Sequence, residues 1–129
     1  WQEARKRVDR PGLVTEYGCD AHADGRGVDE EAQAKYHEGC LRDLVLNQAG
    51  GELEGNSIGG IIFQYPDEWW KANDDPFTQA TRAQGNAPFP DGMGHEEWFG
   101  IAGQGSGRNS PFERNLREVY EYYKSVWGE

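Results

Sequence analysis

The strongest structural signal in the chain is Leu13–Gly18, with the sequence Leu-Val-Thr-Glu-Tyr-Gly. Its first three residues form a short apolar and β-branched run, and Glu16, Tyr17 and Gly18 follow directly. Such a run, bounded by polar and turn-forming residues, is typical of a buried strand. We therefore expect a strand over residues 13–15, with Glu16 at its C-terminal tip.

Helices are predicted before and after this strand. Residues 1–8 suit the end of an amphipathic helix, which stops at Asp9–Gly12. Asp29 is a good N-cap for a second helix, and Gly50-Gly51 follow its expected end. The apolar residues of this second helix recur at four-residue spacing or flank that stripe: Ala32, Tyr36, Cys40, Leu41, Leu44 and Val45.

The second half of the chain predicts another strand and another helix. A short buried strand is expected over Ile61–Tyr65. The stretch Lys71–Asn109 has neither a helical nor a strand period, and we expect an ordered binding loop there. Ser110–Glu113 is a capping box with proline at the first helical position, so a helix is predicted from this point to Gly128.

Buried strands that alternate with helices predict parallel β/α units, and hence an α/β fold. Two strands do not make a stable parallel sheet by themselves, and a complete (β/α)8 TIM barrel needs about 250 residues. The chain has 129 residues and starts at Trp1, without an initiator Met, in what looks like the middle of a helix. We therefore expect residues 1–129 to be the C-terminal portion of a single barrel domain whose N-terminal part lies outside this chain.

The composition favours some partners over others. The net charge of −10 would repel the phosphates of nucleic acid and an anionic membrane surface. No run of about 18 apolar residues is present, so no transmembrane helix is predicted. Five tryptophans and six tyrosines, together with 23 acidic residues, suit a neutral carbohydrate, although aromatic residues are equally at home in a core.

Cysteine and histidine residues give no sign of a metal site or a cofactor. Cys19 follows a predicted strand and Cys40 lies well inside a predicted helix, so we expect no disulfide between them, although either could pair with a cysteine elsewhere. His22, His37 and His95 lack a metal-ligand spacing. His37 is expected to be solvated on its helix, and no cofactor is predicted.

In β/α barrels the active site lies at the C-terminal ends of the strands. Glu16 occupies this position on the first strand, and Tyr65, Asp67 and Glu68 occupy it on the second. Retaining glycoside hydrolysis requires an ionised carboxylate as nucleophile and a second carboxyl group about 5–5.5 Å away as acid/base. Spacing alone leaves a second interpretation open, because a Glu at a strand end more often caps a loop or forms a salt bridge.

Three motifs in this order resemble clan A glycoside hydrolases. Leu13–Gly18 resembles their seventh-strand motif, in which the Glu is the catalytic nucleophile. Gly59–Lys71 resembles the eighth strand, where an aromatic residue, usually Trp, forms the floor of the sugar subsite. Asp91–Ile101 resembles a loop that follows this strand in family 2-like glycosidases and β-glucanosyltransferases, and the final helix matches the eighth barrel helix. The resemblance covers nearly the whole chain.

The resemblance implies a retaining β-glycosidase or transglycosidase that acts on a β-linked polysaccharide such as β-glucan, outside the cell or in the cell wall. Glu16 would be the nucleophile, and the acid/base Glu of the family has no counterpart in this chain. Tyr65 stands where Trp is more common. The substrate-binding residues that it implies are Tyr17, Tyr65, Asp67, Glu68, Trp69, Trp70, Glu97 and Trp98.

Several alternatives stay open at this point. One of the adjacent residues Trp69 and Trp70 is expected to pack inward. Asp67 and Glu68 could stabilise their loop by hydrogen bonds instead of binding a sugar. Glu97 and Trp98 could pack against the barrel instead of lining a cleft. The chain could also belong to a non-catalytic, carbohydrate-binding or structural barrel that has kept the motifs, or be one piece of a barrel that other chains complete.

Overall fold

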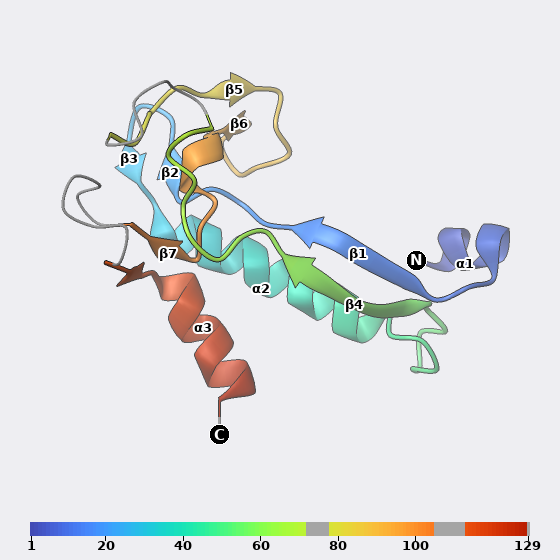
Figure 1. The fold of residues 1–129 in the computed structure, drawn as a ribbon. Helices are drawn as coiled ribbons and strands as arrows, with labels where there is room; N and C mark the ends of the chain where they lie inside the picture. The colour runs from blue at the N-terminus through green and yellow to red at the C-terminus, as the bar shows by residue number, and fades with distance from the viewer. Residues whose placement is uncertain (72–77, 105–112, 129) are drawn as a thin grey trace.

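The computed structural model describes residues 1–71, 78–104 and 113–128, and it is a mixed α/β structure (Figure 1). Strands β1 and β4 form its main sheet, helices α2 and α3 lie on the same side of it, and short strands and a 3-10 helix gather beyond the C-terminal ends of β1 and β4 (Figure 1). The elements are α1 (Gln2–Val8), β1 (Gly12–Tyr17), β2 (His22–Ala23), β3 (Gly27–Val28), α2 (Glu30–Leu46), β4 (Ser57–Ile62), β5 (Gln84–Gly85), β6 (Met93–Gly94), η1 (Glu96–Trp98), β7 (Ala102–Gly103), β8 (Asn115–Leu116) and α3 (Glu118–Trp127).

Strands β1 and β4 are parallel, and α2 connects them, so the predicted β/α unit is confirmed. The prediction of the second strand over Ile61–Tyr65 was wrong in its bounds, because pairing with β1 starts at Ser57 and stops at Ile62. Gly60, which precedes the predicted strand, lies inside β4. A Cβ atom there would come within 2.9 Å of the ring of Tyr17, so the close packing of the two strands requires glycine.

Helix α2 has the predicted cap and end. The Asp29 carboxylate accepts a hydrogen bond of 3.0 Å from the backbone N–H of Ala32, and the helix ends at Leu46, before Gly50. The prediction that His37 is solvated was wrong, because α3 covers this side of α2. His37 is fully buried, and its Nδ1 lies 3.0 Å from the hydroxyl of Tyr123.

The core lies where α2, α3 and the sheet meet. Its buried residues are Ile101, Val119 and Tyr123, and half-buried apolar side chains surround them: Tyr17, Ala34, Leu41, Ile62, Tyr120 and Tyr122. Helix α3 contributes Val119 and Tyr123, which lie four residues apart on one apolar face of the helix. Burial of this apolar stripe against α2 is the main reason why the final helix packs where it does.

The predicted start of the final helix was wrong. Residues 110–112 lie outside the described residues, Glu113 is not helical, and the helix begins at Glu118. Leu116 pairs instead with Ala102 in the short antiparallel sheet of β7 and β8. Pairing between strands, together with the extended backbone of Arg117, therefore overrides the local capping signal at this point.

The stretch Lys71–Asn109, expected to be an ordered loop, is described for residues 78–104 and contains short regular elements. Strands β5 and β6 pair as a hairpin through Gln84 and Gly94, and η1 follows. Elements of two or three residues are too short to show a period in sequence, which explains why they were not predicted.

Several further features bear on the fold prediction. Each sheet of the described residues has two strands, so no closed barrel is formed within them. The prediction that both strands are buried is wrong within the described residues, because apolar side chains on β1 and β4 are exposed, including Leu13 and Ile61. Cys19 and Cys40 are both free thiols, which confirms that they do not pair with each other. None of the described helices is long and apolar enough to cross a membrane.

Candidate functional site

Glu16 lies on a local irregularity of β1. Between the pairs Val14–Gly60 and Tyr17–Ile62, β1 carries the two residues Thr15 and Glu16 opposite the single residue Ile61 of β4. An extra residue of this kind is a β-bulge, which redirects side chains and is frequent next to active sites. Thr15 and Glu16 are both exposed, whereas Tyr17 turns toward the helices. The Glu16 carboxylate makes no hydrogen bond or ion pair with the other described residues and is accessible.

The segment that follows β4 presents two exposed aromatic side chains. Tyr65 is 52% exposed and Trp70 is 59% exposed, while Trp69 is buried at 5%. The structure therefore settles the choice between the adjacent tryptophans, because Trp69 packs inward and Trp70 faces outward. Glu68 is half-buried and forms an ion pair of 2.7 Å with Lys71. We refer to Glu16, Tyr65, Glu68 and Trp70 as the strand-end surface.

The side chain of Tyr17 lies on the core side of the sheet, whereas the side chain of Glu16 is exposed. Its hydroxyl accepts a hydrogen bond of 3.0 Å from the hydroxyl of Tyr123, and its ring centroid lies 5.8 Å from that of His37. Burial raises the pKa of Tyr17. Its predicted role in substrate binding is therefore replaced by a packing role, since the irregularity in β1 places Tyr17 and Glu16 differently.

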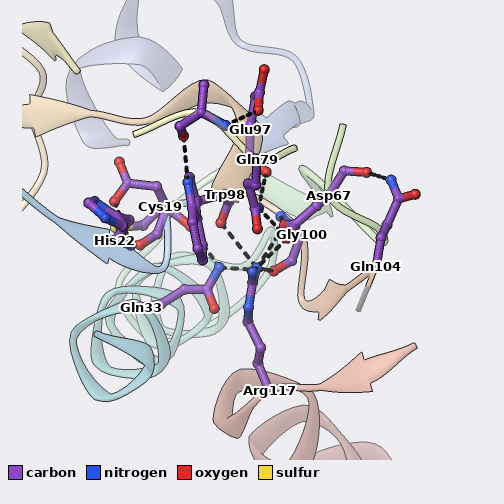
Figure 2. Close-up of polar contacts among 12 residues, drawn as sticks. Cys19, His22, Gln33, Asp67, Gln79, Glu97, Trp98, Gly100, Gln104 and Arg117 are labelled. Carbon is purple, nitrogen blue, oxygen red and sulfur yellow. Dashed lines mark hydrogen bonds and ion pairs between the residues drawn. The ribbon is translucent and has the colours of Figure 1, made fainter. Parts of the chain in front are cut away.

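Asp67 is fully buried and forms a two-pronged ion pair with Arg117 (Figure 2). The two guanidinium nitrogens of Arg117 lie 2.8 and 2.6 Å from the two carboxylate oxygens. Arg117 also donates to the backbone carbonyls of Trp98 and Gly100. Burial raises the pKa of Asp67, and the ion pair with Arg117 opposes this effect. Asp67 was predicted to bind a sugar, but its oxygens are already occupied inside the protein.

Further polar side chains complete this network, which we call the Asp67–Arg117 network (Figure 2). The amide of Gln79 donates to Asp67 Oδ2 over 2.6 Å and to the carbonyl of Glu97 over 2.7 Å. The amide of Gln33 donates to the carbonyls of Cys19 and Gly100 over 2.9 and 3.1 Å. These bonds connect α2, the segment after β4 and the start of α3, so the network fixes the loops relative to the helices.

Glu97 and Trp98 are integrated into the same structure. Glu97 is fully buried, and its carboxylate accepts a hydrogen bond from the backbone N–H of Ala80. The indole N–H of Trp98 donates to the carbonyl of Ala80 over 2.8 Å. The Trp98 ring lies 4.9 Å from the His22 ring and 5.7 Å from the Arg117 guanidinium. Both side chains therefore take part in loop packing, and Glu97 is closed off from the surface while Trp98 is half-buried.

The network was not predicted from the sequence beyond the structural alternative for Asp67. Arg117 and Asp67 are 50 residues apart, and Gln33 lies on a helix that sequence places far from both. Gly100 offers a signal in retrospect, because a Cβ atom there would come within 2.3 Å of the Asp67 backbone nitrogen. A glycine allows another backbone segment to approach closely, but the sequence does not say which segment that is.

The structure brings His22 and His95 together. Their ring centroids are 4.3 Å apart, and both side chains are buried. Within the described ranges, no group of three or more His, Cys, Asp or Glu residues is arranged to hold a metal ion.

Comparisons with protein-family models, with curated proteins and with solved structures found no match for this chain.

Proposed function

We propose that this chain contributes the nucleophile to a retaining β-glycosidase or β-transglycosidase that acts on a β-linked polysaccharide such as β-glucan. The observation that carries the proposal is the strand-end surface. Glu16 presents an accessible carboxylate near the C-terminal end of a strand in a parallel β/α unit, and Tyr65 and Trp70 are exposed just after the neighbouring strand. Parallel β/α folds use this end of their strands for catalysis.

The proposed reaction uses Glu16 in two steps. Its carboxylate attacks the anomeric carbon of the sugar, while an acid protonates the glycosidic oxygen as the carbon–oxygen bond breaks. The glycosyl ester on Glu16 is then attacked by water or by an acceptor sugar, which gives up its proton to the same acid/base group. Water gives hydrolysis and a sugar acceptor gives transfer. A glutamate from outside this chain is proposed as the acid/base.

The exposed aromatic side chains suit a carbohydrate. Tyr65 and Trp70 each offer a flat apolar face together with a polar group at the rim, and amphipathic rings of this kind pack well against sugar rings. Glu68, at the same surface, could accept hydrogen bonds from sugar hydroxyls, although it is paired with Lys71. The proposed location of such an enzyme is the cell wall or the extracellular space.

The exposed apolar side chains of the main sheet support a larger domain. Leu13 and Ile61 are 48% and 54% exposed on adjacent parallel strands. Parallel sheets are normally covered on both faces and continued by further strands. We propose that β1 and β4 are the seventh and eighth strands of a (β/α)8 barrel, and that the remaining strands cover these side chains.

The direct test is to trap the glycosyl ester. The full protein that carries this chain is incubated with an activated 2-deoxy-2-fluoro-β-glucoside, and its peptides are analysed by mass spectrometry. We expect the fluorosugar on the peptide that contains Glu16, and no labelling in Glu16→Gln. Glu52→Gln serves as the matched control, because Glu52 is also exposed but precedes β4. A label on another carboxylate would disprove the assignment.

The exposure of Tyr65 and Trp70 also supports a second function, because these rings are available for sugar binding even if Glu16 is not a catalytic residue. A non-catalytic, carbohydrate-binding barrel would use them for sugar binding alone. In that case, the protein would bind a soluble β-glucan without producing reducing ends or transfer products. Glu16→Gln would then leave binding unchanged, whereas Trp70→Ala would weaken it.

A further inference from the structure

A pair of buried histidines joins the two loops beyond the main sheet. His22 follows β1 and is 8% exposed, and His95 precedes η1 and is 1% exposed. Their ring centroids are 4.3 Å apart, and the ring of Trp98 lies 4.9 Å from that of His22 on the same interface. The rings are tilted relative to each other, by 57° between His22 and His95, and they form part of the contact between residues 18–28 and residues 91–98.

Backbone hydrogen bonds cross the interface beside the rings. Asp20 Oδ2 accepts from the backbone N–H of His95 over 2.9 Å, and Asp91 Oδ2 accepts from the backbone N–H of Asp24 over 2.8 Å. The backbone N–H of Ala21 donates to the carbonyl of Trp98 over 3.0 Å. These three bonds connect the two loops beside the packed rings.

The ring nitrogens themselves are poorly satisfied. Nδ1 of His22 and both ring nitrogens of His95 are buried without a hydrogen-bond partner in the described part of the chain. Asp24 Oδ1 lies 4.0 Å from His95 Nε2, which is beyond hydrogen-bonding distance. Neutral imidazoles tolerate such a site better than charged ones, because burial penalises an unpaired charge most strongly.

The charged groups that face the pair come from both loops and from the start of α2. The carboxylates of Asp20 and Asp91 already accept backbone N–H groups, and Asp24 is largely exposed. Arg26 and Asp29 line the small cavity beside His22 and form an ion pair of 3.7 Å with each other. One protonated ring could turn toward Asp24, but a second positive charge would face the first across 4.3 Å.

We propose that His22 and His95 form an acid-sensitive latch between residues 18–28 and residues 91–98, which is closed while the rings are neutral and opens when His22 takes up a proton. Burial, followed by the neighbouring His95, lowers the pKa of His22, in the direction that this latch requires. Opening would separate the Trp98 ring from the His22 ring on which it packs. The proposal does not depend on glycosidase activity.

Proton linkage determines the direction in which a change of pH shifts the equilibrium between the closed and open states. In the open state His22 titrates near its ordinary pKa of about 6.5, whereas the closed state resists protonation. As the pH falls from 7.5 to 5.5, the open state therefore takes up more protons than the closed state, which favours opening by up to about tenfold. The latch is fully closed above the ordinary pKa and loosens as the pH falls below it.

The test is hydrogen exchange of the full protein at pH 7.5 and 5.5, corrected for the intrinsic rate. We expect protection of the amides of Ala21, Asp24 and His95 to fall at pH 5.5, by up to about tenfold. In His22→Phe, which keeps a ring but cannot be protonated, protection at pH 7.5 should persist and its pH dependence should disappear. A fall of the same size in His22→Phe would overturn the proposal.

Two further measurements keep the test decisive. Amides of α2 near His37 report a separate buried histidine, and a pH response that is equal in α2 and in the loops would reflect general unfolding and refute the latch. If His22→Phe fails to fold, the imidazole carbon signals of the unmodified protein are titrated by NMR. A pKa of His22 at or above its ordinary value, with unchanged loop protection at pH 5.5, would also refute it.

Discussion

The strand-end surface and the Asp67–Arg117 network contain the same kinds of residue in opposite environments. Each has a carboxylate and a tryptophan close to a strand end, namely Glu16 with Trp70 and Asp67 with Trp98. Asp67 is fully buried and bound to Arg117, while Glu16 is exposed and makes no contact of this kind with the described residues. The difference teaches that residue type and position along a strand do not separate a reactive carboxylate from a structural one. The two kinds of carboxylate differ in their solvent accessibility and in how many of their hydrogen-bonding positions are already occupied.

The sharpest way to separate the two carboxylates is to remove the charge of each. In the full protein, Glu16→Gln should reduce turnover roughly 10⁴-fold or more, because losing a nucleophile removes a covalent step. The free energy of unfolding should stay within about 0.5 kcal/mol, since an exposed side chain is changed. Turnover is measured with an aryl β-glucoside, and stability with urea.

Asp67→Asn is the comparison variant. It should lower the stability while the turnover of the molecules that remain folded changes far less than in Glu16→Gln. If Glu16→Gln turned over substrate as fast as the unmodified protein, Glu16 would be excluded as the nucleophile.

The next largest effect is expected at Arg117. Arg117→Ala leaves the Asp67 carboxylate buried without its partner, which should cost about 3–5 kcal/mol of unfolding free energy. Denaturant unfolding of the full protein measures this loss. The double variant Asp67→Ala with Arg117→Ala should be less destabilised than the sum of the single variants, because no unpaired charge remains. Strict additivity would show that the ion pair contributes no coupling.

The adjacent tryptophans provide an internal control for the strand-end surface. Trp69→Ala should destabilise the protein by about 3–5 kcal/mol, because a buried aromatic side chain leaves a cavity. Trp70→Ala should change stability by less than about 0.5 kcal/mol, since Trp70 is largely exposed. Affinity for a soluble β-glucan, measured by calorimetry, should fall in Trp70→Ala. Similar stability losses in both variants would mean that Trp70 is also covered.

The last prediction concerns the pH dependence of the stability, which the buried His37 should cause. Burial lowers the pKa of His37 to about 4. Below about pH 6.5, His37 therefore takes up a proton in the unfolded chain but stays neutral in the folded protein. The free energy of unfolding falls as the pH drops from 6.5 toward 4. Between pH 7 and pH 4.5 the loss should be about 2 kcal/mol. Urea unfolding at pH 7 and pH 4.5 measures it.

His37→Gln is the control for this pH dependence, because an amide cannot take up the proton. The difference in stability between pH 7 and pH 4.5 should shrink in this variant by most of the predicted amount. An unchanged difference would assign the acid sensitivity to other groups, such as the His22–His95 pair.

Local patterns in the sequence were sufficient for the regular elements with strong signals. The Asp29 cap, the end of α2 before Gly50, and the parallel strands joined by α2 were all predicted, because caps, glycines and apolar runs act over a few neighbouring residues. The end of the final helix at Gly128 followed the same logic. The sequence also placed Glu16 near a strand end, which the structure confirms.

The tertiary structure alone decided which side chains are buried and which are presented. His37 is buried because α3 covers it, Trp69 and not Trp70 packs inward, and α3 begins late because Leu116 pairs with Ala102. Each outcome depends on contacts between residues far apart in the chain, and such contacts leave no periodic trace in the sequence. The sequence therefore determined the elements and the candidate nucleophile. Long-range packing determined which of the neighbouring acidic and aromatic residues remain available for function.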